Sequence, residues 1–431
     1  MKLERLVTSR FHRSLTLPFQ GSIHHFSMTP TNGEQASLRP SKRALPPPSS
    51  GPNHAEYWAK LTALGNTPGY CDLGQGKPEF DPVAEAVQAV TGALSDPRSS
   101  QYAPVVGHPK LIGSIQRYEE RTFGRQVGEG ECTVVCSATE GLYAAFVATL
   151  EPGDEVIVPQ PCFPWYVPQL RLAGAVPVSL HLKKEDLFRL TRKELDARVT
   201  SKTRGLLINS PHNPTGHVWD EEELTEICDF CKQHNLVLYS DEVYERQVFG
   251  SHRHLRAAGM PGMKERTLTI ASAGKLFCCT GWRIGWVMGP PELIAAICRV
   301  RSYMTYCAPT ILQLGISAAL DAALVDYPKD PFTLLLKRNA DTLAPALKAA
   351  GLTVVPPQGG YFLVADTTAL KMDAMTFCDL MAEKAKVVAV PMATFYSEDP
   401  DPNLVRFALC KTEDTVQEAA ARLKQHMSLS A

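Results

Sequence analysis

The 431-residue chain lacks several features that would place it in other classes of protein. No run of about 18 apolar residues is present, so the sequence offers no transmembrane helix. Neither sign of charge predominates, because 44 Lys and Arg residues nearly cancel 45 Asp and Glu residues. A balanced charge provides no long-range field that would recruit nucleic acid or an anionic membrane. A small molecule is therefore the expected partner.

The twelve cysteines lack the regular spacing of a disulfide framework. Cys228 and Cys231 form one Cys-x-x-Cys pair, followed by His234, but no second pair of ligands follows at zinc-finger spacing. The pair also lies in an amphipathic stretch that begins near Asp220. We interpret these thiols as parts of a helix, with no metal bound, and we expect a reducing compartment.

Acidic residues are nearly missing from residues 1–30, where Glu4 is the only one. Hydroxyl side chains are frequent there, and the basic residues are Lys2, Arg5, Arg10 and Arg13. This composition is typical of mitochondrial or plastid transit peptides. A disordered tail without a targeting function is the alternative, and a start at Met28 would give a shorter cytoplasmic form.

Periodicity indicates an α/β fold with a mostly parallel sheet, because short β-branched runs alternate with helical stretches. We predict strands at 133–136, 155–158, 205–209, 236–240, 267–271 and 284–288. Asp220 and Glu223 have the spacing of a capping box at the start of one crossover helix. After residue 331 the pattern changes to helix and strand pairs, with strands at 387–390 and 404–410 and a final helix from Thr412.

These patterns predict five segments. Residues 1–30 are the transit peptide, and residues 31–52, which contain the run Pro46, Pro47 and Pro48, are a flexible linker. Residues 53–84 are an N-terminal segment that joins the smaller domain. Residues 85–330 form the large domain with the sheet, and residues 331–431 form a small C-terminal α/β domain.

Ligands of open α/β sheets bind beyond the carboxyl ends of the strands, so residues just after each predicted strand are candidates for the site. They are Ser137, Ala138, Thr139, Phe163, Asn213, Asp241, Tyr244, Ser272 and Lys275. The small residues 137–139 lead into a helix around residues 141–150 and would present free N–H groups to a phosphate. Lys275 follows an apolar strand, where partial desolvation makes an amine nucleophilic.

One further residue extends this set of candidates, and one member of the set has a distinct expected role. Arg283 would add a phosphate donor beside Ser272. Asp241 is placed to pair with a protonated ring nitrogen, and a carboxylate that caps a helix or closes a turn is the alternative.

Several ordered motifs resemble the class I aminotransferases of the aspartate aminotransferase fold, which is fold type I of the pyridoxal-phosphate enzymes. The motifs are residues 209–216 (NSPHNPTG), 240–244 (SDEVY), 272–275 (SAGK) and 281–286 (GWRIGW). Residues 73–76 (LGQG), 272–277 (SAGKLF) and 358–362 (QGGYF) are most similar to the kynurenine aminotransferases, also known as glutamine transaminase K or cysteine-conjugate β-lyase. The resemblance extends from about Trp58 to Leu423.

This resemblance implies a pyridoxal 5'-phosphate cofactor bound covalently to Lys275, which would also move the proton at the substrate Cα. Asp241 would hold the pyridine nitrogen, Asn213 and Tyr244 the ring hydroxyl, and Phe163 would stack on the ring. The residues implied for the phosphate are Ser137, Ala138, Thr139, Ser272, Arg283 and, from a second copy of the chain, Tyr102. The enzyme would therefore be a homodimer with shared active sites.

For the substrate, the resemblance implies that Arg406 grips the α-carboxylate, together with Asn213 and the Gly76 backbone. The residues implied around the substrate side chain are Trp58, Tyr361 and, from the second copy, Tyr306. Three positions depart from the pattern. Ser137 replaces a glycine in the phosphate turn, which we expect to be a mild change, Cys307 replaces a histidine, and Lys77 replaces an aromatic residue. The last two leave the identity of the substrate open.

The resulting expectation is a ping-pong transaminase that moves the amino group of an L-amino acid to a 2-oxo acid. The donor would be neutral aromatic, thioether, or glutamine- or kynurenine-like. Cysteine-conjugate β-elimination, synthase chemistry on sulfonium substrates, and transamination of acidic substrates of the aspartate or prephenate type remain alternatives. A pyridoxal-fold regulator would need a nucleic-acid-binding domain, and a nicotinamide dehydrogenase would need Gly-x-Gly-x-x-Gly where residues 73–79 read LGQGKPE.

Overall fold

The computed structural model describes residues 41, 54–322 and 330–427. Residues 1–30, predicted as a transit peptide, and all of the predicted linker except Ser41 lie outside this part. From residue 54 onward the described chain belongs to one compact unit. Its central sheet has seven strands: β2 Cys132–Val135, β3 Glu155–Gln160, β4 Val176–His181, β5 Thr203–Asn209, β6 Val237–Asp241, β7 Thr267–Ser272 and β8 Gly285–Met288.

The strand order is β2-β8-β7-β6-β5-β3-β4. All neighbours from β7 to β4 pair in parallel, whereas β8 is antiparallel to both β7 and β2. The six predicted strands are therefore confirmed, with ends that differ by one or two residues. The seventh, β4, was not predicted, because it is a half-exposed edge strand interrupted by Pro177, and such a strand lacks a clear apolar pattern.

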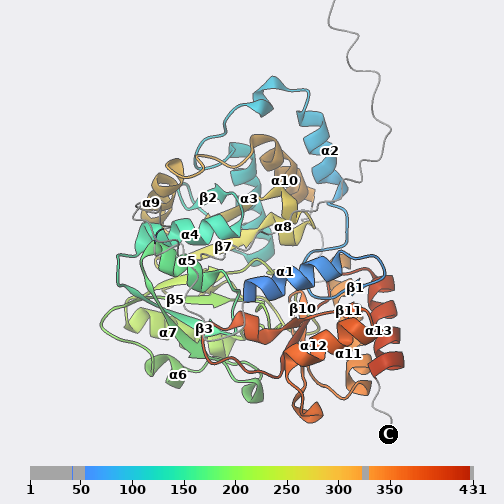
Figure 1. The fold of residues 1–431 in the computed structure, drawn as a ribbon. Coiled ribbons are helices and arrows are strands. Elements are labelled where there is room, and N and C mark those ends of the chain that lie inside the picture. Colours follow the sequence, from blue (N-terminus) through green and yellow to red (C-terminus); the bar gives the residue numbers. More distant parts are fainter. Residues whose placement is uncertain (1–40, 42–53, 323–329, 428–431) are drawn as a thin grey trace, which may run out of the picture. The chain divides into compact units, whose positions relative to one another are not determined.

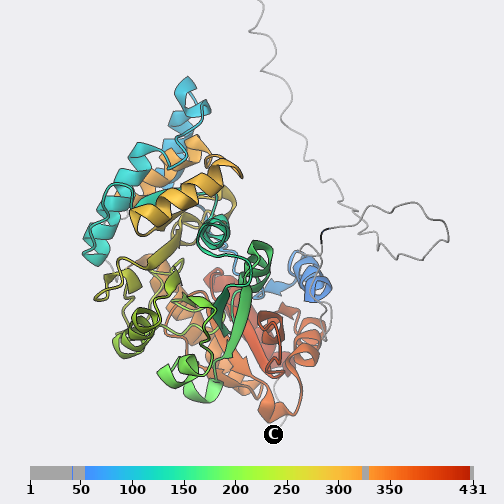
Figure 2. The same ribbon diagram turned by 90° about the vertical axis from the view of Figure 1, so that its left-hand side faces the viewer.

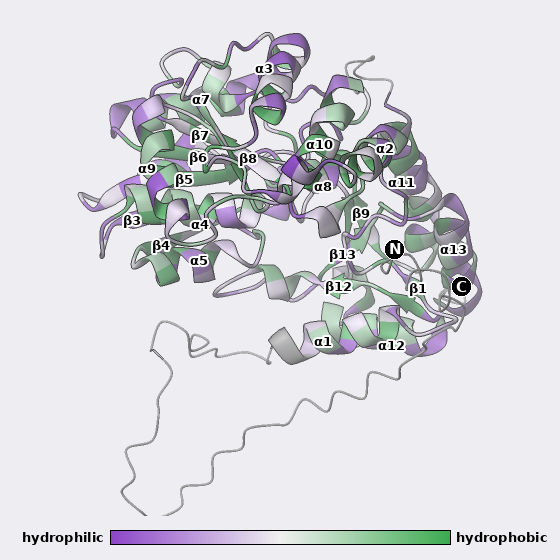
Figure 3. Ribbon diagram, turned by 90° about the horizontal axis from the view of Figure 1, so that it is seen from above, coloured by the Kyte–Doolittle hydropathy of each residue, from purple (hydrophilic) through white to green (hydrophobic). Residues whose placement is uncertain are grey.

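Helices cover both faces of this sheet (Figures 1 and 2). Val156 and Val158 of β3 pack with one face, while Ile157 between them points to the other, as the two-residue period of a strand requires. The first face is covered by α4 Ala138–Thr149, α5 Tyr166–Ala173 and α9 Pro291–Ser302. The second is covered by α3 Pro109–Phe123, α7 Glu221–Gln233 and α10 Thr310–Ala322. Figure 3 shows hydrophobic residues in the strands β5, β6 and β7 and hydrophilic residues along α3.

Helix α7 begins as predicted. The Asp220 carboxylate accepts a hydrogen bond from the Glu223 N–H, and the Glu223 side chain accepts one from the Asp220 N–H, which together form a capping box. Cys228 and Cys231 are buried in the apolar face of this helix. Within the described ranges, no cluster of His, Cys, Asp and Glu could hold a metal ion, and no helix is long and apolar enough to cross a membrane.

The C-terminal part contains a four-stranded antiparallel sheet in the order β12-β13-β10-β9. The strands are β9 Thr353–Val355, β10 Phe362–Asp366, β12 Val390–Pro391 and β13 Leu404–Ala408. Its helices are α11 Pro331–Ala349, α12 Ala374–Lys384 and α13 Glu413–Met427. The predicted strand 387–390 is split between β12 and β11, Val387–Val388, and the predicted final helix is α13.

Strand β1, Cys71–Asp72, pairs in parallel with β11, so the N-terminal segment joins the C-terminal part. The remaining α-helices of the described residues are α1 His54–Gly65, α2 Ala84–Ala93, α6 Arg192–Asp196 and α8 Ala273–Leu276. The domain boundaries at residues 84/85 and 330/331 stay predictions, because the described residues from 54 onward form a single unit.

Gly285, the first residue of β8, allows β8 to approach the turn before α4. A Cβ at this position would lie 2.7 Å from the Ala271 carbonyl oxygen and 2.9 Å from the Ala138 nitrogen, and neither backbone atom can move alone. We expect Gly285→Ala to lower the free energy of unfolding by about 1–3 kcal/mol, the usual range for overpacking.

Gly281 supplies the matched control for this substitution. A Cβ there would meet nothing within 4 Å, so Gly281→Ala should unfold at or above the temperature of the parent protein. The measurement is the thermal denaturation midpoint of the three proteins. An equal midpoint for Gly285→Ala and the parent would show that the turn can shift freely.

Candidate active site

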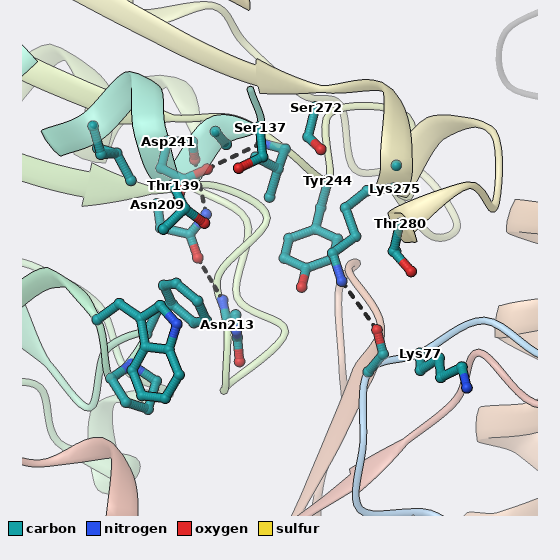
Figure 4. A pocket seen from close by; sticks show the side chains of 18 of the residues that line it. Lys77, Ser137, Thr139, Asn209, Asn213, Asp241, Tyr244, Ser272, Lys275 and Thr280 are labelled. Carbon is teal, nitrogen blue, oxygen red and sulfur yellow. Dashed lines mark hydrogen bonds between the residues drawn. The ribbon is translucent and has the colours of Figure 1, made fainter. Parts of the chain in front are cut away.

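A cavity opens at the carboxyl ends of β5, β6 and β7, where polar residues were predicted to gather. Figure 4 shows Asp241, Asn213, Tyr244, Ser272 and Lys275 around it. The structure brings most of the predicted residues into its lining: Trp58, Gly76, Ser137, Ala138, Thr139, Phe163, Asn213, Asp241, Tyr244, Ser272, Lys275, Arg283 and Arg406. They come from both the N-terminal and C-terminal parts of the chain.

Three predicted residues do not line the cavity in a single copy of the chain. Tyr102 and Tyr306 are 83% and 46% exposed, and their rings pack edge to face 5.4 Å apart. Tyr361 is fully buried, and its hydroxyl donates to the main-chain oxygen of Lys275 at 2.6 Å. The structure thus gives Tyr361 a contact with Lys275, and its direct contact with the substrate stays a prediction.

Lys275 follows β7 directly and lies in the short helix α8. Its amine donates to the Gly76 carbonyl oxygen at 3.0 Å (Figure 4). The same amine lies 5.2 Å from the centre of the Tyr361 ring. Removal of the amine from water lowers its pKa, and the positive charges of Arg406 and Arg283 act in the same direction. A larger share of this lysine is therefore neutral and able to react with a carbonyl.

Asp241 is the last residue of β6 and is 4% exposed. Its Oδ2 accepts a hydrogen bond from the Tyr166 hydroxyl at 2.5 Å, and its Oδ1 accepts one from the Val243 N–H at 3.2 Å. Burial raises the pKa of this carboxyl group to about 6, although both hydrogen bonds lower it.

The neighbouring carboxylate shows what Asp241 lacks. Glu242 accepts hydrogen bonds from the Arg256 guanidinium at 2.8 Å and from His254 at 2.6 Å, and these partners hold its pKa at about 2 in spite of burial. Within the described part of the chain, Asp241 forms no such ion pair. A buried carboxylate without a cation is costly, so this position suits a positively charged ligand group.

The turn before α4 is the predicted phosphate site. Ser137 has φ 81° and ψ 159°, a region that glycine occupies readily and other residues at a cost of about 1–3 kcal/mol. The substitution of serine for glycine is therefore less mild than expected. The Ser137 hydroxyl accepts a hydrogen bond from Arg283 at 2.7 Å, and the free N–H groups of α4 follow directly. The turn combines anion-binding N–H groups with a guanidinium.

Arg406 enters the cavity from β13 and is 3% exposed. Its guanidinium donates to the Asn213 side-chain oxygen at 3.0 Å and to the Gly74 carbonyl oxygen at 2.8 Å. The rings of Phe362 and Phe395 lie 3.9 Å and 4.4 Å from it. Burial lowers its pKa to about 10, so the group remains charged at neutral pH, and its buried Nε has no hydrogen-bond partner among the described residues.

The sequence alone missed several residues of this site. Asn209 donates to the Asp241 carbonyl oxygen at 2.8 Å and accepts from the Asn213 N–H at 2.7 Å. It ends β5, so the rule that selected Asp241 could have found it. Tyr166 and Phe395 carry no such signal, because one begins a helix and the other ends a short 3₁₀ helix far along the chain.

Together these groups fit pyridoxal 5'-phosphate, the cofactor implied by the motifs. Asp241 offers an anion without a protein cation, the turn at Ser137 offers phosphate donors, and Lys275 offers an amine of lowered pKa. When bound, this cofactor acts as an electron sink for chemistry at the substrate Cα. Arg406 retains an unpaired buried donor for a carboxylate.

Comparisons with known proteins agree with this chemistry. Residues 68–423 match the family model "Aminotransferase class I and II". A probable N-succinyldiaminopimelate aminotransferase, DapC, from Mycobacterium tuberculosis is 39% identical over 86% of this chain and 96% of its own length. Kynurenine–oxoglutarate transaminase 3 from Mus musculus is 34% identical over 85% of this chain and 86% of its own length.

Solved structures show the same fold. YbdL from Escherichia coli, described with a methionine aminotransferase function, has a TM-score of 0.82 at 30% identity, over 90% of this chain and 100% of that one. The aspartate aminotransferase of Thermus thermophilus with maleate has a TM-score of 0.81 at 30% identity, with the same coverage. The chain therefore belongs to the class I and II aminotransferases, the pyridoxal-phosphate-dependent transaminases of the aspartate aminotransferase fold.

Proposed function

We propose that this transaminase takes the amino group of a neutral aromatic, thioether, or glutamine- or kynurenine-like L-amino acid and passes it to a 2-oxo acid by a ping-pong mechanism. One observation carries this choice: aromatic rings surround the carboxylate-binding end of the cavity. Trp58 and Phe395 pack edge to face at 6.0 Å, and both rings face Arg406. An apolar substrate side chain would bury its surface there.

The residues divide the work as follows. Arg406 orients the substrate through its α-carboxylate, and this contact fixes the position of Cα. Lys275 has an amine of lowered pKa, so it would move the proton between the substrate Cα and the cofactor. Asp241 would accept a hydrogen bond from the protonated pyridine nitrogen of the bound cofactor. The relatives named for kynurenine and methionine support this choice of donor.

A second candidate is transamination of acidic substrates. Lys77 lines the cavity next to Gly76, although its ammonium points away from Lys275 in the structure (Figure 4). The side chain is exposed and flexible, so it can turn toward a distal carboxylate. The relative named for N-succinyldiaminopimelate also supports an acidic substrate.

Cysteine-conjugate β-elimination is a third candidate, because the same residues remove the Cα proton in transamination and in β-elimination.

We further propose that the enzyme is a homodimer with shared sites. Tyr102 and Tyr306 are exposed, adjacent aromatic residues outside the cavity of their own chain. A second copy would bury this apolar surface and bring Tyr102 toward the phosphate and Tyr306 toward the substrate. Dimerisation is typical of this family.

The first prediction concerns reaction type. With phenylalanine, methionine or kynurenine and a 2-oxo acid, the purified enzyme should form one new amino acid for each donor consumed. Lys275→Ala should lose essentially all turnover and remain folded. The other lysine in the cavity lining, Lys77, points away from Lys275 and cannot replace its amine. Amino-acid analysis decides this. Ammonia and pyruvate from a cysteine conjugate, without a new amino acid, would instead indicate the lyase.

The second prediction concerns Lys77. An exposed ion pair contributes about 0.2–1 kcal/mol, so Lys77→Met should lower the ratio of kcat/KM for glutamate to that for phenylalanine by about 1.5- to 5-fold. Lys348→Met is the control, since this exposed lysine lies on α11 outside the cavity lining. If the ratio is unchanged in Lys77→Met, the idea of an acidic subsite at Lys77 is wrong.

The third prediction concerns location. We propose that residues 1–30 direct the chain to the mitochondrion or plastid, because they are basic, rich in hydroxyls and nearly free of acids. Removal of residues 1–30 should leave kcat and KM unchanged and move a fluorescent fusion to the cytosol. The fusion of the whole chain to the same reporter is the control. Identical locations for the two fusions would contradict the proposal.

A further inference from the structure

Tyr166 and Asp241 form a buried pair that the motifs did not indicate. Tyr166 is the first residue of α5 and is 1% exposed, and its hydroxyl donates to Asp241 Oδ2 at 2.5 Å. The other hydrogen bond to this carboxylate comes from the Val243 N–H at 3.2 Å, on Oδ1. The hydrogen bond from the phenol is therefore shorter than the one from the Val243 N–H.

The proton of this hydrogen bond belongs to the phenol. Burial and the neighbouring charge of Asp241 raise the pKa of Tyr166 well above its usual value, whereas burial brings that of Asp241 only to about 6. A hydrogen bond donated to a carboxylate stabilises its charged form. The Tyr166 hydroxyl thus opposes the cost of burying an ionised Asp241.

The same short segment also places the other parts of the cofactor site. The Phe163 and Tyr166 rings pack edge to face at 5.5 Å, and the Tyr166 N–H donates to the Phe163 carbonyl oxygen at 3.1 Å. One turn further on, the Gln169 amide donates to the Thr139 carbonyl oxygen at 2.8 Å, at the start of α4. Helix α5 therefore contacts Asp241, Phe163 and the phosphate turn at the same time.

We propose that Tyr166 is a positioning residue for transamination: its hydroxyl keeps the Asp241 carboxylate ionised and oriented to accept the N–H of the cofactor's pyridine ring. The proposal rests on the assigned role of Asp241. Without the phenol, the carboxylate becomes more basic and takes the proton from the ring nitrogen. The ring then withdraws electrons less strongly, and the step at the substrate Cα slows.

The test compares Tyr166→Phe with Tyr239→Phe. Tyr239 is an equally buried tyrosine whose hydroxyl bonds with Thr149 at 2.6 Å and is outside the cavity lining, so both variants lose one buried hydroxyl. With ¹⁵N-labelled pyridoxal phosphate, the ring-nitrogen resonance at neutral pH should move toward that of neutral pyridine in Tyr166→Phe alone. Its kcat should fall about 10- to 100-fold, the range for a hydrogen bond to a charged group, with KM little changed.

A double-mutant cycle with Asp241→Asn separates the outcomes. In that background the carboxylate is gone, so Tyr166→Phe should cause no further loss of kcat. An equal additional loss there, or an unshifted ring-nitrogen resonance in Tyr166→Phe, would overturn the proposal and leave the aminotransferase assignment intact. If Asp241→Asn itself keeps the parent resonance and turnover, the assigned role of Asp241 fails, and the proposal for Tyr166 fails with it.

Discussion

The parallel hydrogen bonding of β5, β6 and β7 is the constraint on which the active site depends. This pairing sets Asn209 opposite Asp241, and Asp241 opposite Ile270 near the end of β7. Because parallel strands end at the same edge, the residues that follow each strand share one cavity. A shift of one residue in this register would turn Asp241 into the opposite layer of the protein. The site is therefore a consequence of how the sheet is aligned.

The C-terminal part of the chain completes the cavity with a cation, the guanidinium of Arg406. Arg406 reaches the site because β13 pairs with β10 and β12 in the C-terminal sheet. The loop of residues 73–76, which follows β1, is also fixed by the C-terminal part. Asp72 accepts hydrogen bonds from the Gly74 and Gln75 N–H groups and forms an ion pair with the buried Lys411 at 3.3 Å. The carbonyl groups that receive Arg406 and Lys275 are therefore held by an ion pair outside the cavity.

Asp241 and Glu242, which are adjacent at the end of β6, have different hydrogen-bond partners and different roles. Glu242 forms an ion pair with Arg256 and accepts a hydrogen bond from His254, in a buried polar group that anchors the strand behind the site. Asp241 is left with a phenol and an amide, so its charge is available to a ligand. Burial acts on both carboxyl groups, and their partners alone separate their pKa values.

The sequence by itself determined the α/β class, six of the seven strands of the central sheet, the capped start of α7 and about half of the cavity lining. These features are local: a strand shows its period, a capping box needs four residues, and the polar residue after a strand is next to it in the chain. Edge strand β4 and the short strand β9 gave weaker patterns and were missed, and β10 was missed although Phe362–Asp366 is a buried, mostly apolar run. Only the tertiary structure decided which distant groups meet. Tyr166 reaches Asp241 across 75 residues, and Arg406 reaches Asn213 across 193. No local pattern records such contacts, because packing of the helices and of the second sheet creates them.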